Sequence, residues 1–309
     1  MASDYRERVR RGLVLYDGAM GTMLFAQGLV DGESPEPWNW ERPEIVGGIY
    51  RAYYQAGSDV VQTNTFGGTP IKLSERDLQE RTHEANLVAA RAARALCPEG
   101  RYVAGNVGPI GKFLQPMGEY TKAEFQENFE TQVRGLVDGG VDLISIETMY
   151  SLDEAVAAVR GAKKVCDLPV SVCMTFDKNP RGFFTLMGET VPRSMEVLAA
   201  EGADVVGSNC SHGSPVFLEL TRLIRDSTGL PVIIQPNRGR PTLEGGSVIY
   251  KQTAAEFIDD MKVIVGMGVN VIGGCCGTEP VFISGLRDAL HGHFPVDSSP
   301  ADVSRVART

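Results

Sequence analysis

Short apolar runs alternate with longer amphipathic stretches along most of the chain. Each run is nearly continuously hydrophobic over four or five residues and ends in small or polar residues. This pattern is typical of parallel strands that are buried on both faces of a sheet. The eight predicted strands cover residues 13–18, 58–64, 101–108, 142–148, 169–176, 204–210, 231–237 and 270–276.

The stretches between these runs have the apolar spacing of amphipathic helices. Several of them end in glycine just before the next run, as expected of helix C-caps. Eight strands that alternate with helices over about 280 residues predict an α/β protein with a single (β/α)8 barrel, the TIM barrel. The clearest predicted helices cover residues 78–96, 122–140, 151–165, 193–202, 215–229 and 254–268.

A doubly wound open sheet is the rival architecture for the same alternation. Such a sheet usually carries a GxGxxG turn after its first strand, and the DGAMGTM segment (17–23) lacks that spacing. We therefore favour a barrel over residues 1–293, followed by a polar, aperiodic tail over 294–309. Residues 28–43 are too long for a simple turn and are expected to form an active-site loop after the first strand.

Charge and composition exclude several classes of function. The chain has 30 Lys and Arg against 39 Asp and Glu, a net charge of −9, which argues against a basic surface for nucleic acid. The N-terminus lacks the apolar segment of a signal peptide, and no run approaches the roughly 18 apolar residues of a membrane span. We expect a soluble, cytoplasmic protein, whose six cysteines stay reduced and serve metal binding or catalysis.

Three of the cysteines fall at predicted strand ends, which form the active-site face of a barrel. Cys210 ends the sixth strand, and the adjacent Cys275 and Cys276 end the eighth. Three converging thiolates suit Zn²⁺, which prefers four ligands, and the open fourth position is typical of a catalytic site. Packing or redox chemistry is the alternative for a vicinal cysteine pair, and the spacing alone does not decide between them.

A zinc site of this kind favours alkyl transfer to a thiol over hydrolysis. Three anionic ligands acidify a bound water less than three histidines do. A thiol in the open position loses its proton outright, and its sulfur stays nucleophilic because the site is rich in electrons.

Seven segments, in order along residues 12–290, together resemble the homocysteine S-methyltransferase family. That family includes betaine–homocysteine methyltransferase, S-methylmethionine-dependent enzymes and the N-terminal module of cobalamin-dependent methionine synthase. The resemblance implies a (β/α)8 barrel that binds Zn²⁺ through Cys210, Cys275 and Cys276. The segments are DGAMGTML (17–24), TNTFGG (63–68), GNVGPIGK (105–112), ET (147–148), SNCSHG (208–213), QPNRGRP (235–241) and GGCCGT (273–278).

The resemblance also assigns residues that bind the substrate. Asn237 matches a residue whose side-chain oxygen fills the fourth zinc position in some members until homocysteine sulfur displaces it. Asp17, Gly18 and Glu147 match residues that hold the amino acid end of homocysteine. The chemistry of Glu147 agrees, since a carboxylate at a strand end suits an ammonium group, whereas Asp17 fits an Asp-Gly turn equally well.

The activity that the resemblance implies is that of a homocysteine S-methyltransferase. Such an enzyme transfers a methyl group from an onium or methylcorrinoid donor to the zinc-bound thiolate of homocysteine and forms methionine. One alternative is a module that works with a separate corrinoid protein or on a different, anionic thiol acceptor. A zinc hydrolase or lyase is a further alternative, a non-catalytic binding module is the weakest one, and the oligomeric state is left open, a homo-oligomer included.

Residues near the predicted mouth are candidates for the donor side. Trp38, Trp40 and Phe66 could form a partial aromatic cage for an onium group, with loop packing as the alternative. Arg238 and Arg240 stand where family members usually have small or apolar residues. They could bind an anionic donor or acceptor, although a solvated loop face is slightly favoured.

Three more polar residues at the strand ends are expected to play minor parts. We expect Asn64 and Asn106 to bind loop backbone, as side-chain amides in such positions often do. His212 is expected to lie outside the ligand set, because the cysteines already supply three ligands.

Overall fold

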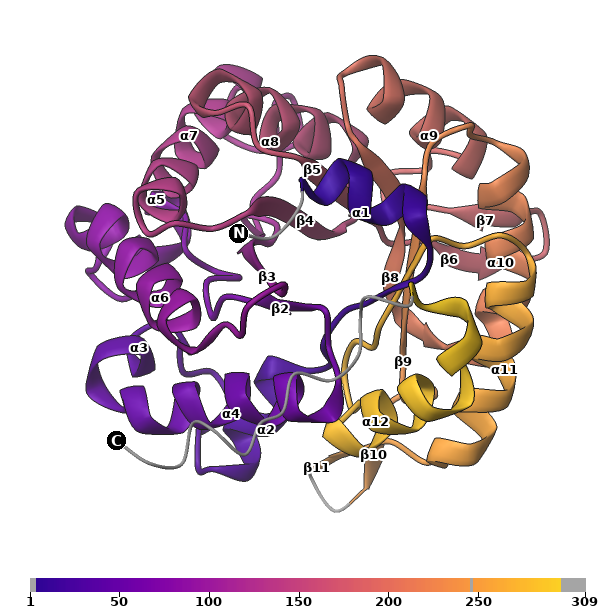
Figure 1. The fold of residues 1–309 in the computed structure, drawn as a ribbon. Helices are drawn as coiled ribbons and strands as arrows, with labels where there is room; N and C mark the ends of the chain where they lie inside the picture. The colour runs from indigo at the N-terminus through magenta and orange to yellow at the C-terminus, as the bar shows by residue number, and fades with distance from the viewer. Residues whose placement is uncertain (1–3, 245–246, 296–309) are drawn as a thin grey trace.

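Eight parallel strands form a barrel that is surrounded by helices (Figure 1). The computed structural model describes residues 4–244 and 247–295. Neighbouring strands pair in the order β1-β12-β9-β8-β5-β4-β3-β2, and a parallel bridge between Tyr16 and Val60 joins the two ends. The strands are β1 (Val14–Leu15), β2 (Val60–Gln62), β3 (Tyr102–Val107), β4 (Leu143–Met149), β5 (Val170–Met174), β8 (Val205–Gly213), β9 (Val232–Asn237) and β12 (Val271–Ile272).

The predicted barrel is therefore confirmed, and the open sheet was the wrong alternative. Every predicted strand range overlaps one barrel strand, although β4 and β8 run past the predicted ends. The apolar runs are continuous because the strands are covered on both sides, by the barrel interior and by the helices. Strands β1 and β12 are shorter than predicted, because the chain leaves the sheet after Tyr16 and after Ile272.

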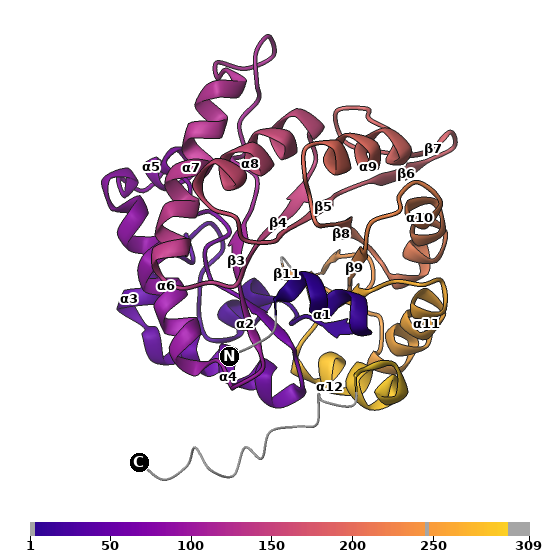
Figure 2. The ribbon, with the colours of Figure 1, turned by 45° about the horizontal axis from the view of Figure 1, so that its top comes forward.

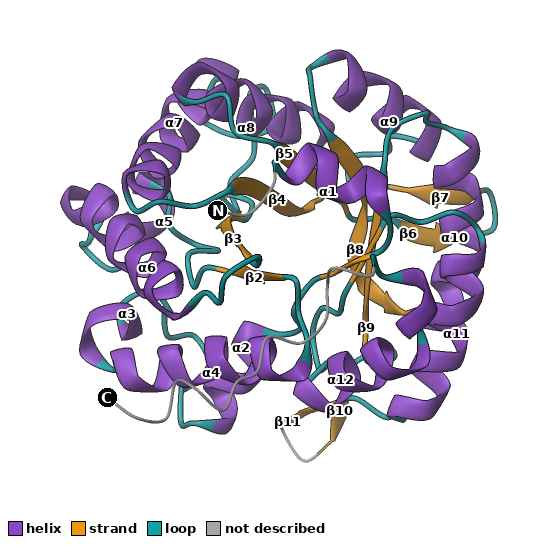
Figure 3. Ribbon diagram, viewed as in Figure 1, coloured by secondary structure: helices purple, strands orange, loops and turns teal. Residues whose placement is uncertain are grey.

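The helices lie around the outside of the barrel (Figure 3). The six predicted helices correspond to α6–α11, and threonines at the predicted starts of α7 and α11 form capping boxes with the glutamates three residues on. The helices around the barrel are α2 (Met20–Ala26), α3 (Trp38–Glu41), α4 (Pro43–Ala56), α5 (Pro70–Ser74), α6 (Thr82–Leu96), α7 (Lys122–Asp138), α8 (Leu152–Val165), α9 (Val191–Ala200), α10 (Ser214–Asp226), α11 (Ala254–Gly266) and α12 (Pro280–Ala289), with 3-10 turns at Gln79–Arg81 and His291–His293.

Two small hairpins stand outside the barrel and were not predicted. Strands β6 (Asp177–Asn179) and β7 (Gly182–Phe184) follow β5, and β10 (Thr242–Glu244) and β11 (Ser247–Ile249) follow β9. Each hairpin belongs to a connection that leaves the carboxyl end of a barrel strand. Both therefore extend the face on which a barrel builds its site.

The long loop at residues 28–43 also packs on that face. It contains α3, and its Glu36 side chain accepts a hydrogen bond from the backbone of Gly67 at 2.6 Å. Asn39 Nδ2 donates to the carbonyl of Asn64 at 2.8 Å. The loop is thus held against the segment that follows β2.

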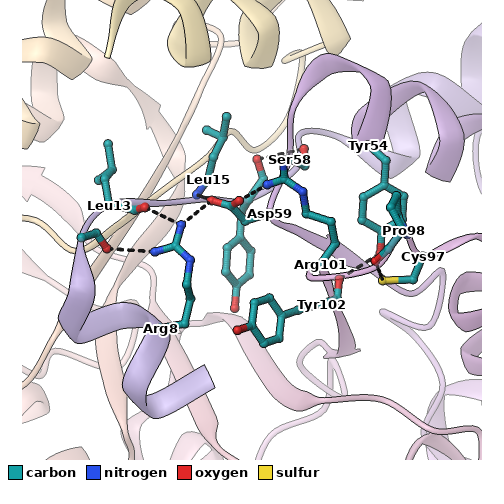
Figure 4. Close-up of polar contacts among 12 residues, drawn as sticks. Arg8, Leu13, Leu15, Tyr54, Ser58, Asp59, Cys97, Pro98, Arg101 and Tyr102 are labelled. Carbon is teal, nitrogen blue, oxygen red and sulfur yellow. Dashed lines mark hydrogen bonds and ion pairs between the residues drawn. The ribbon is translucent and has the colours of Figure 1, made fainter. Parts of the chain in front are cut away.

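The opposite end of the barrel is covered by α1 (Tyr5–Arg11), which lies across it in Figure 2. Tyr5 and Val9 pack among the inward-facing residues of the strands. Asp59, 5% exposed as a side chain, accepts a hydrogen bond from Arg8 Nη2 at 2.9 Å and also pairs with Arg101 (Figure 4). This buried ion pair network attaches α1 to the start of β2.

None of the helices in the described ranges is long and apolar enough to cross a bilayer. Phe294, at the start of the predicted tail, packs against the core, and residues 296–309 of that tail lie outside the described part of the chain.

Candidate functional site

Cys210, Cys275 and Cys276 lie together at the carboxyl ends of β8 and β12. Their sulfur atoms are all within 4.8 Å of one another. Cys276 Sγ is 3.9 Å from Cys210 Sγ and 4.0 Å from Cys275 Sγ. Within residues 4–244 and 247–295, no other group of three or more cysteine, histidine or carboxylate side chains is arranged to hold a metal ion.

The spacing of these sulfurs fits a tetrahedral metal ion. Zinc–sulfur bonds of about 2.3 Å place the sulfurs of a tetrahedral site about 3.8 Å apart, close to the separations seen here. The side chain of Asn237 bonds to Cys210, while its buried Oδ1 has no hydrogen-bond partner among the described residues. Three thiols beside an unpartnered amide oxygen could therefore hold a metal ion.

The backbone makes an unusual turn where Cys210 enters the site. Cys210 and Ser211 have φ angles of 64° and 58°, and Thr148, which follows Glu147, has a φ of 60°. Residues other than glycine seldom adopt this left-handed conformation, and such strain is concentrated at functional sites. The register of β8 against β9 shifts at the same place, so the bulge turns Cys210 toward the other thiols.

The turn after β12 is held against two other strand ends. The backbone of Cys275 donates to Pro236 O at 2.8 Å, and Gly274 donates to Asp17 O at 3.0 Å. A Cβ at Gly274 would lie 2.2 Å from Thr278 Oγ1, so glycine is needed for this close approach. These contacts fix the cysteine pair beside the ends of β1 and β9.

The three thiols act on one another electrostatically. Hydrogen bonds from Cys275 and Cys276 lower the pKa of Cys210, and the same contact with Cys210 raises the pKa of Cys275. One thiolate is thus stabilised by two thiols. Binding of a metal ion would release the remaining protons, because the thiolate is the form that binds.

Two buried carboxylates, Asp17 and Glu147, lie at strand ends of the same barrel, and the charge of Cys210 acts on Glu147. Asp17 Oδ2 accepts a hydrogen bond from the backbone of Gln62 at 2.7 Å. Gln62 Nε2 lies 3.5 Å from both Asp17 Oδ1 and Glu147 Oε2. The amide of Gln62 therefore links the two carboxylates.

Asn106 and Asn209 orient Glu147. Asn106 Nδ2 donates to Glu147 Oε1 at 2.5 Å, and Asn209 Nδ2 donates to Glu147 Oε2 at 3.1 Å. Asn209 Nδ2 is also 3.8 Å from Cys275 Sγ, so it connects the carboxylate to the thiols.

Burial controls the charge of the two carboxylates. It raises the pKa of Glu147 to about 7 and that of Asp17 well above its ordinary value. Besides burial, the main groups that act on these carboxyls are amide hydrogen-bond donors, the charge of Glu147 on Asp17 and the charge of Cys210 on Glu147. The pocket is therefore suited to a ligand that brings its own positive charge, such as an ammonium group.

The prediction for Asn106 was wrong, because its side chain bonds to Glu147 instead of loop backbone. The end of β3 directs the Asn106 side chain into the barrel, where the Glu147 carboxylate accepts its hydrogen bond. Asn64 behaves as predicted and donates to Pro35 O at 2.7 Å. His212 Nε2 lies 3.3 Å from Asp177 Oδ1 and is not part of the thiol cluster.

The aromatic donor-side candidates occupy different environments. Trp38 is 6% exposed, with Arg42 4.8 Å above its ring, and Trp40 is covered by Arg81 at 4.4 Å. These contacts favour the loop-packing alternative for both tryptophans. Phe66 is 39% exposed on the segment after β2 and stays available at the mouth.

The two arginines after Asn237 also differ. Arg238 donates from Nε to Gln252 O at 3.0 Å, and its guanidinium lies 5.1 Å from the Phe282 ring centre, so it packs within the structure. Arg240 is exposed and lines a cavity of about 810 Å³ together with His212.

Sequence reasoning missed the parts played by Gln62 and Asn209. Gln62 is the polar residue inside the apolar VVQ run, and Asn209 directly precedes Cys210. A polar residue in a strand that is otherwise buried on both faces was the available signal.

Comparison with known proteins agrees with this geometry. The family model described as homocysteine S-methyltransferase matches residues 14–290. The chain belongs to the homocysteine S-methyltransferase family. The family expected from the sequence is thereby confirmed.

Relatives of this homocysteine S-methyltransferase family member include much longer proteins. The methionine synthases of Mycobacterium tuberculosis (strain ATCC 25618 / H37Rv) and Mycobacterium leprae (strain TN) are each 29% identical over 306 residues. These alignments cover 93% of this chain but 25% of each relative. The chain thus spans about a quarter of the length of these relatives.

Solved structures share the barrel. The metallated form of the homocysteine methyltransferase MmuM from Escherichia coli has a TM-score of 0.76 and 23% identity, covering 90% of this chain and 96% of that chain. The carboxyl transferase domain from Rhizobium etli pyruvate carboxylase has a TM-score of 0.52 and 15% identity, covering 94% of this chain and 49% of that one. At these identities the likeness concerns the fold.

Proposed function

We propose that the protein is a zinc-dependent S-methyltransferase that moves a methyl group from an onium or methylcorrinoid donor to the sulfur of homocysteine, forming methionine. The observation that carries the proposal is the thiol cluster beside a buried carboxylate. Asn209 lies between them, 3.8 Å from Cys275 Sγ and 3.1 Å from Glu147 Oε2. Family membership and the methionine synthase relatives support the same activity.

Cys210, Cys275 and Cys276 would hold the zinc ion, with Asn237 Oδ1 beside the fourth position. The sulfur spacing and the metallated state of MmuM support this assignment. When bound, zinc supplies a Lewis acid that lowers the pKa of a thiol placed beside it, while anionic thiolate ligands keep that sulfur nucleophilic.

Glu147 and Asp17 would bind the ammonium group of the amino acid. Asn106 and Asn209 fix the Glu147 carboxylate, so an ammonium ion would meet an acceptor that is already oriented. A Cβ at Gly18 would lie 2.5 Å from Thr278 O, so the glycine lets this backbone turn close tightly next to Asp17. With its amino end held there, homocysteine would direct its sulfur toward the cysteines.

The reaction is a displacement at carbon. The acceptor sulfur forms a bond to the methyl carbon, the bond between that carbon and the donor atom breaks, and its electron pair leaves with the donor. The thiol proton goes to solvent. The protein's task is to orient the acceptor and keep its sulfur nucleophilic.

The donor is the least constrained part of the proposal. Phe66 is the exposed aromatic candidate for an onium group. A methylcorrinoid is the second candidate, and the methionine synthase relatives support it. An anionic thiol acceptor is less favoured, because Arg238 is engaged by Phe282 and Gln252.

A donor panel tests the activity. Zinc-loaded protein is incubated with L-homocysteine and, separately, with betaine, S-methylmethionine, S-adenosylmethionine or methylcobalamin, and methionine is quantified by mass spectrometry. We expect methionine with one donor or more, and none when Cys275→Ala replaces the wild-type chain. No methionine from any of the four donors would contradict the proposed function.

A further inference from the structure

Thr148 and Asn209 connect two barrel strands that do not pair with each other. In the sheet, β5 lies between β4, which carries Thr148, and β8, which carries Asn209. The backbone N–H of Thr148 donates to Asn209 Oδ1 at 2.8 Å, and Asn209 Nδ2 donates to Thr148 Oγ1 at 3.0 Å. A flipped amide would place its own N–H group against the N–H of Thr148, so these two bonds fix the orientation of Asn209.

The conformation of Thr148 brings its hydroxyl to the same amide as the Glu147 carboxylate. Consecutive side chains of a regular strand point to opposite faces, yet Asn209 Nδ2 lies 3.0 Å from Thr148 Oγ1 and 3.1 Å from Glu147 Oε2. Thr148 has a φ of 60°, and the register of β4 against β5 shifts between Ile146 and Met149. A β-branched residue seldom adopts this left-handed conformation, and here the irregular strand end turns the threonine toward Asn209.

Asn209 also stands at an irregular strand end and is held from the strand between. The register of β8 against β9 shifts between Asn209 and Gly213, and Thr175 Oγ1, just after β5, donates to Asn209 O at 3.1 Å. The ends of β4, β5 and β8 are thus joined at this residue. Its Nδ2 faces Glu147 and lies 3.8 Å from Cys275 Sγ.

We propose that Thr148 is a positioning residue of the amino acid site, which holds the Asn209 amide so that its N–H group points to Glu147. The inference rests on the proposed function, since it requires that Glu147 bind the ammonium group of an amino acid. An amide nitrogen has two hydrogens, and the Thr148 hydroxyl accepts one while Glu147 accepts the other. Without the hydroxyl, the amide turns to satisfy its free hydrogen at another acceptor, such as Cys275 Sγ, and Glu147 loses a bond that orients it.

Thr148→Val is the direct test, because it removes the hydroxyl and keeps the branched shape and the backbone N–H. Thr148→Ser restores a hydroxyl at the same position. Thr131→Val is the matched control, since Thr131 Oγ1 donates to Glu127 O within α7, a contact that involves neither Glu147 nor Asn209. The dissociation constant of L-methionine is measured by isothermal titration calorimetry and bound zinc by mass spectrometry, while circular dichroism and thermal melting establish that each variant is folded.

We expect Thr148→Val to bind L-methionine about 3–10-fold more weakly, the factor expected for one hydrogen bond, and to keep the zinc content of the wild type. Thr148→Ser should regain most of the affinity, and Thr131→Val should match the wild type. Wild-type affinity in folded Thr148→Val, no recovery in Thr148→Ser, or loss of zinc together with L-methionine binding would overturn this inference and leave the proposed function standing. Failure of the wild-type protein to bind L-methionine would overturn both this inference and the role proposed for Glu147.

Discussion

Asn209 donates from Nδ2 to Glu147 Oε2 at 3.1 Å and lies directly before Cys210 in the chain. A single side chain thus joins the carboxylate that would hold the amino group to the strand that carries a thiol ligand. Its Nδ2 is also 3.8 Å from Cys275 Sγ. Asn209 thus contacts both Glu147 and the thiol cluster.

Replacement of Asn209 by alanine should therefore lower kcat/KM for homocysteine by about 10–100-fold, since a hydrogen bond to a charged group is worth roughly 1.5–3 kcal/mol. Zinc content should change little, because the three thiols remain. Asn128→Ala is the control, since Asn128 bonds to Glu124 O through Nδ2 and to the backbone of Ile71 through Oδ1, and neither contact involves the thiols or Glu147. An Asn209→Ala enzyme with wild-type kcat/KM would contradict the role given to this residue.

The raised pKa of Glu147 predicts that amino acid binding depends on pH. Burial raises its pKa to about 7, so the carboxylate that attracts an ammonium group forms as the pH rises through that value. Affinity for L-methionine, which has the amino acid end without an ionisable thiol, should rise with pH up to about 7.5 and then level off. Isothermal titration calorimetry measures it.

Glu147→Gln should bind L-methionine weakly and without this pH dependence. Glu154→Gln is a matched control, because burial also raises the pKa of Glu154 to about 7, but its Oε1 accepts from the backbone of Ile110 outside the site. Loss of the pH dependence in Glu154→Gln, with its retention in Glu147→Gln, would rule out the assignment.

The raised pKa values of Glu147 and Glu154 also predict how the stability of the protein changes with pH. Both glutamates have a raised pKa in the folded state, so each contributes stability that is present at low pH and is lost as the pH rises through about 7. The free energy of unfolding can be measured by urea denaturation between roughly pH 5 and pH 8, a range that includes the pKa of both glutamates. The decrease in this free energy as the pH rises should be smaller in the Glu147→Gln, Glu154→Gln double variant than in the wild type. An equal loss would show that other groups dominate.

Asp59 is predicted to stabilise the end of the barrel that α1 covers, on the side away from the cysteines. Asp59→Ala leaves Arg8 and Arg101, with side chains 10% and 15% exposed, without their shared carboxylate. Removing one partner of a buried pair costs about 3–5 kcal/mol, so the free energy of unfolding in urea should fall by that order. Glu7→Ala, which breaks the exposed pair with Arg11, should cost less than about 1 kcal/mol. Equal costs for the two variants would contradict this account of α1.

Replacement of Phe66 and of Trp38 should have different effects, one on donor binding and the other on stability. Phe66→Ala is expected to raise the KM for an onium donor by roughly 3–30-fold with little effect on homocysteine, as loss of about 0.5–2 kcal/mol of cation–π attraction would do. Trp38→Ala is expected to lower thermal stability, because the ring is 6% exposed. A donor KM that changes with Trp38 and not with Phe66 would reverse the assignment.

The fold was predictable because parallel barrel strands, which are buried on both faces, appear in the sequence as short runs of apolar residues. Strands β9 and β4 are buried along nearly their whole length and are rich in valine, leucine and isoleucine before their polar ends, since both faces of the strand are covered. The same topology brings every strand end to one face, which is why Cys210 and Cys275 could be placed together although 65 positions separate them in the numbering.

The remaining details depend on contacts that no local pattern encodes. Whether Asn106 bonds to loop backbone or to Glu147 depends on which side chains meet inside the barrel. Strand β6 has exposed residues at Asp177–Asn179 and so shows no alternation of apolar and polar positions. The Tyr250 ring packs on Gly277, next to Cys276, and its place in the sequence gives no indication of that contact.

The most direct test of the central claim is the zinc stoichiometry of the purified protein and two cysteine variants, measured by inductively coupled plasma mass spectrometry after dialysis. We predict a single tightly held zinc ion in the wild type and in Cys166→Ala, whose thiol donates to Ala162 O outside the site, and its loss in Cys275→Ala. Equal zinc in wild type and Cys275→Ala, or none in the wild type after loading, would contradict the claim that these three thiols form a zinc site.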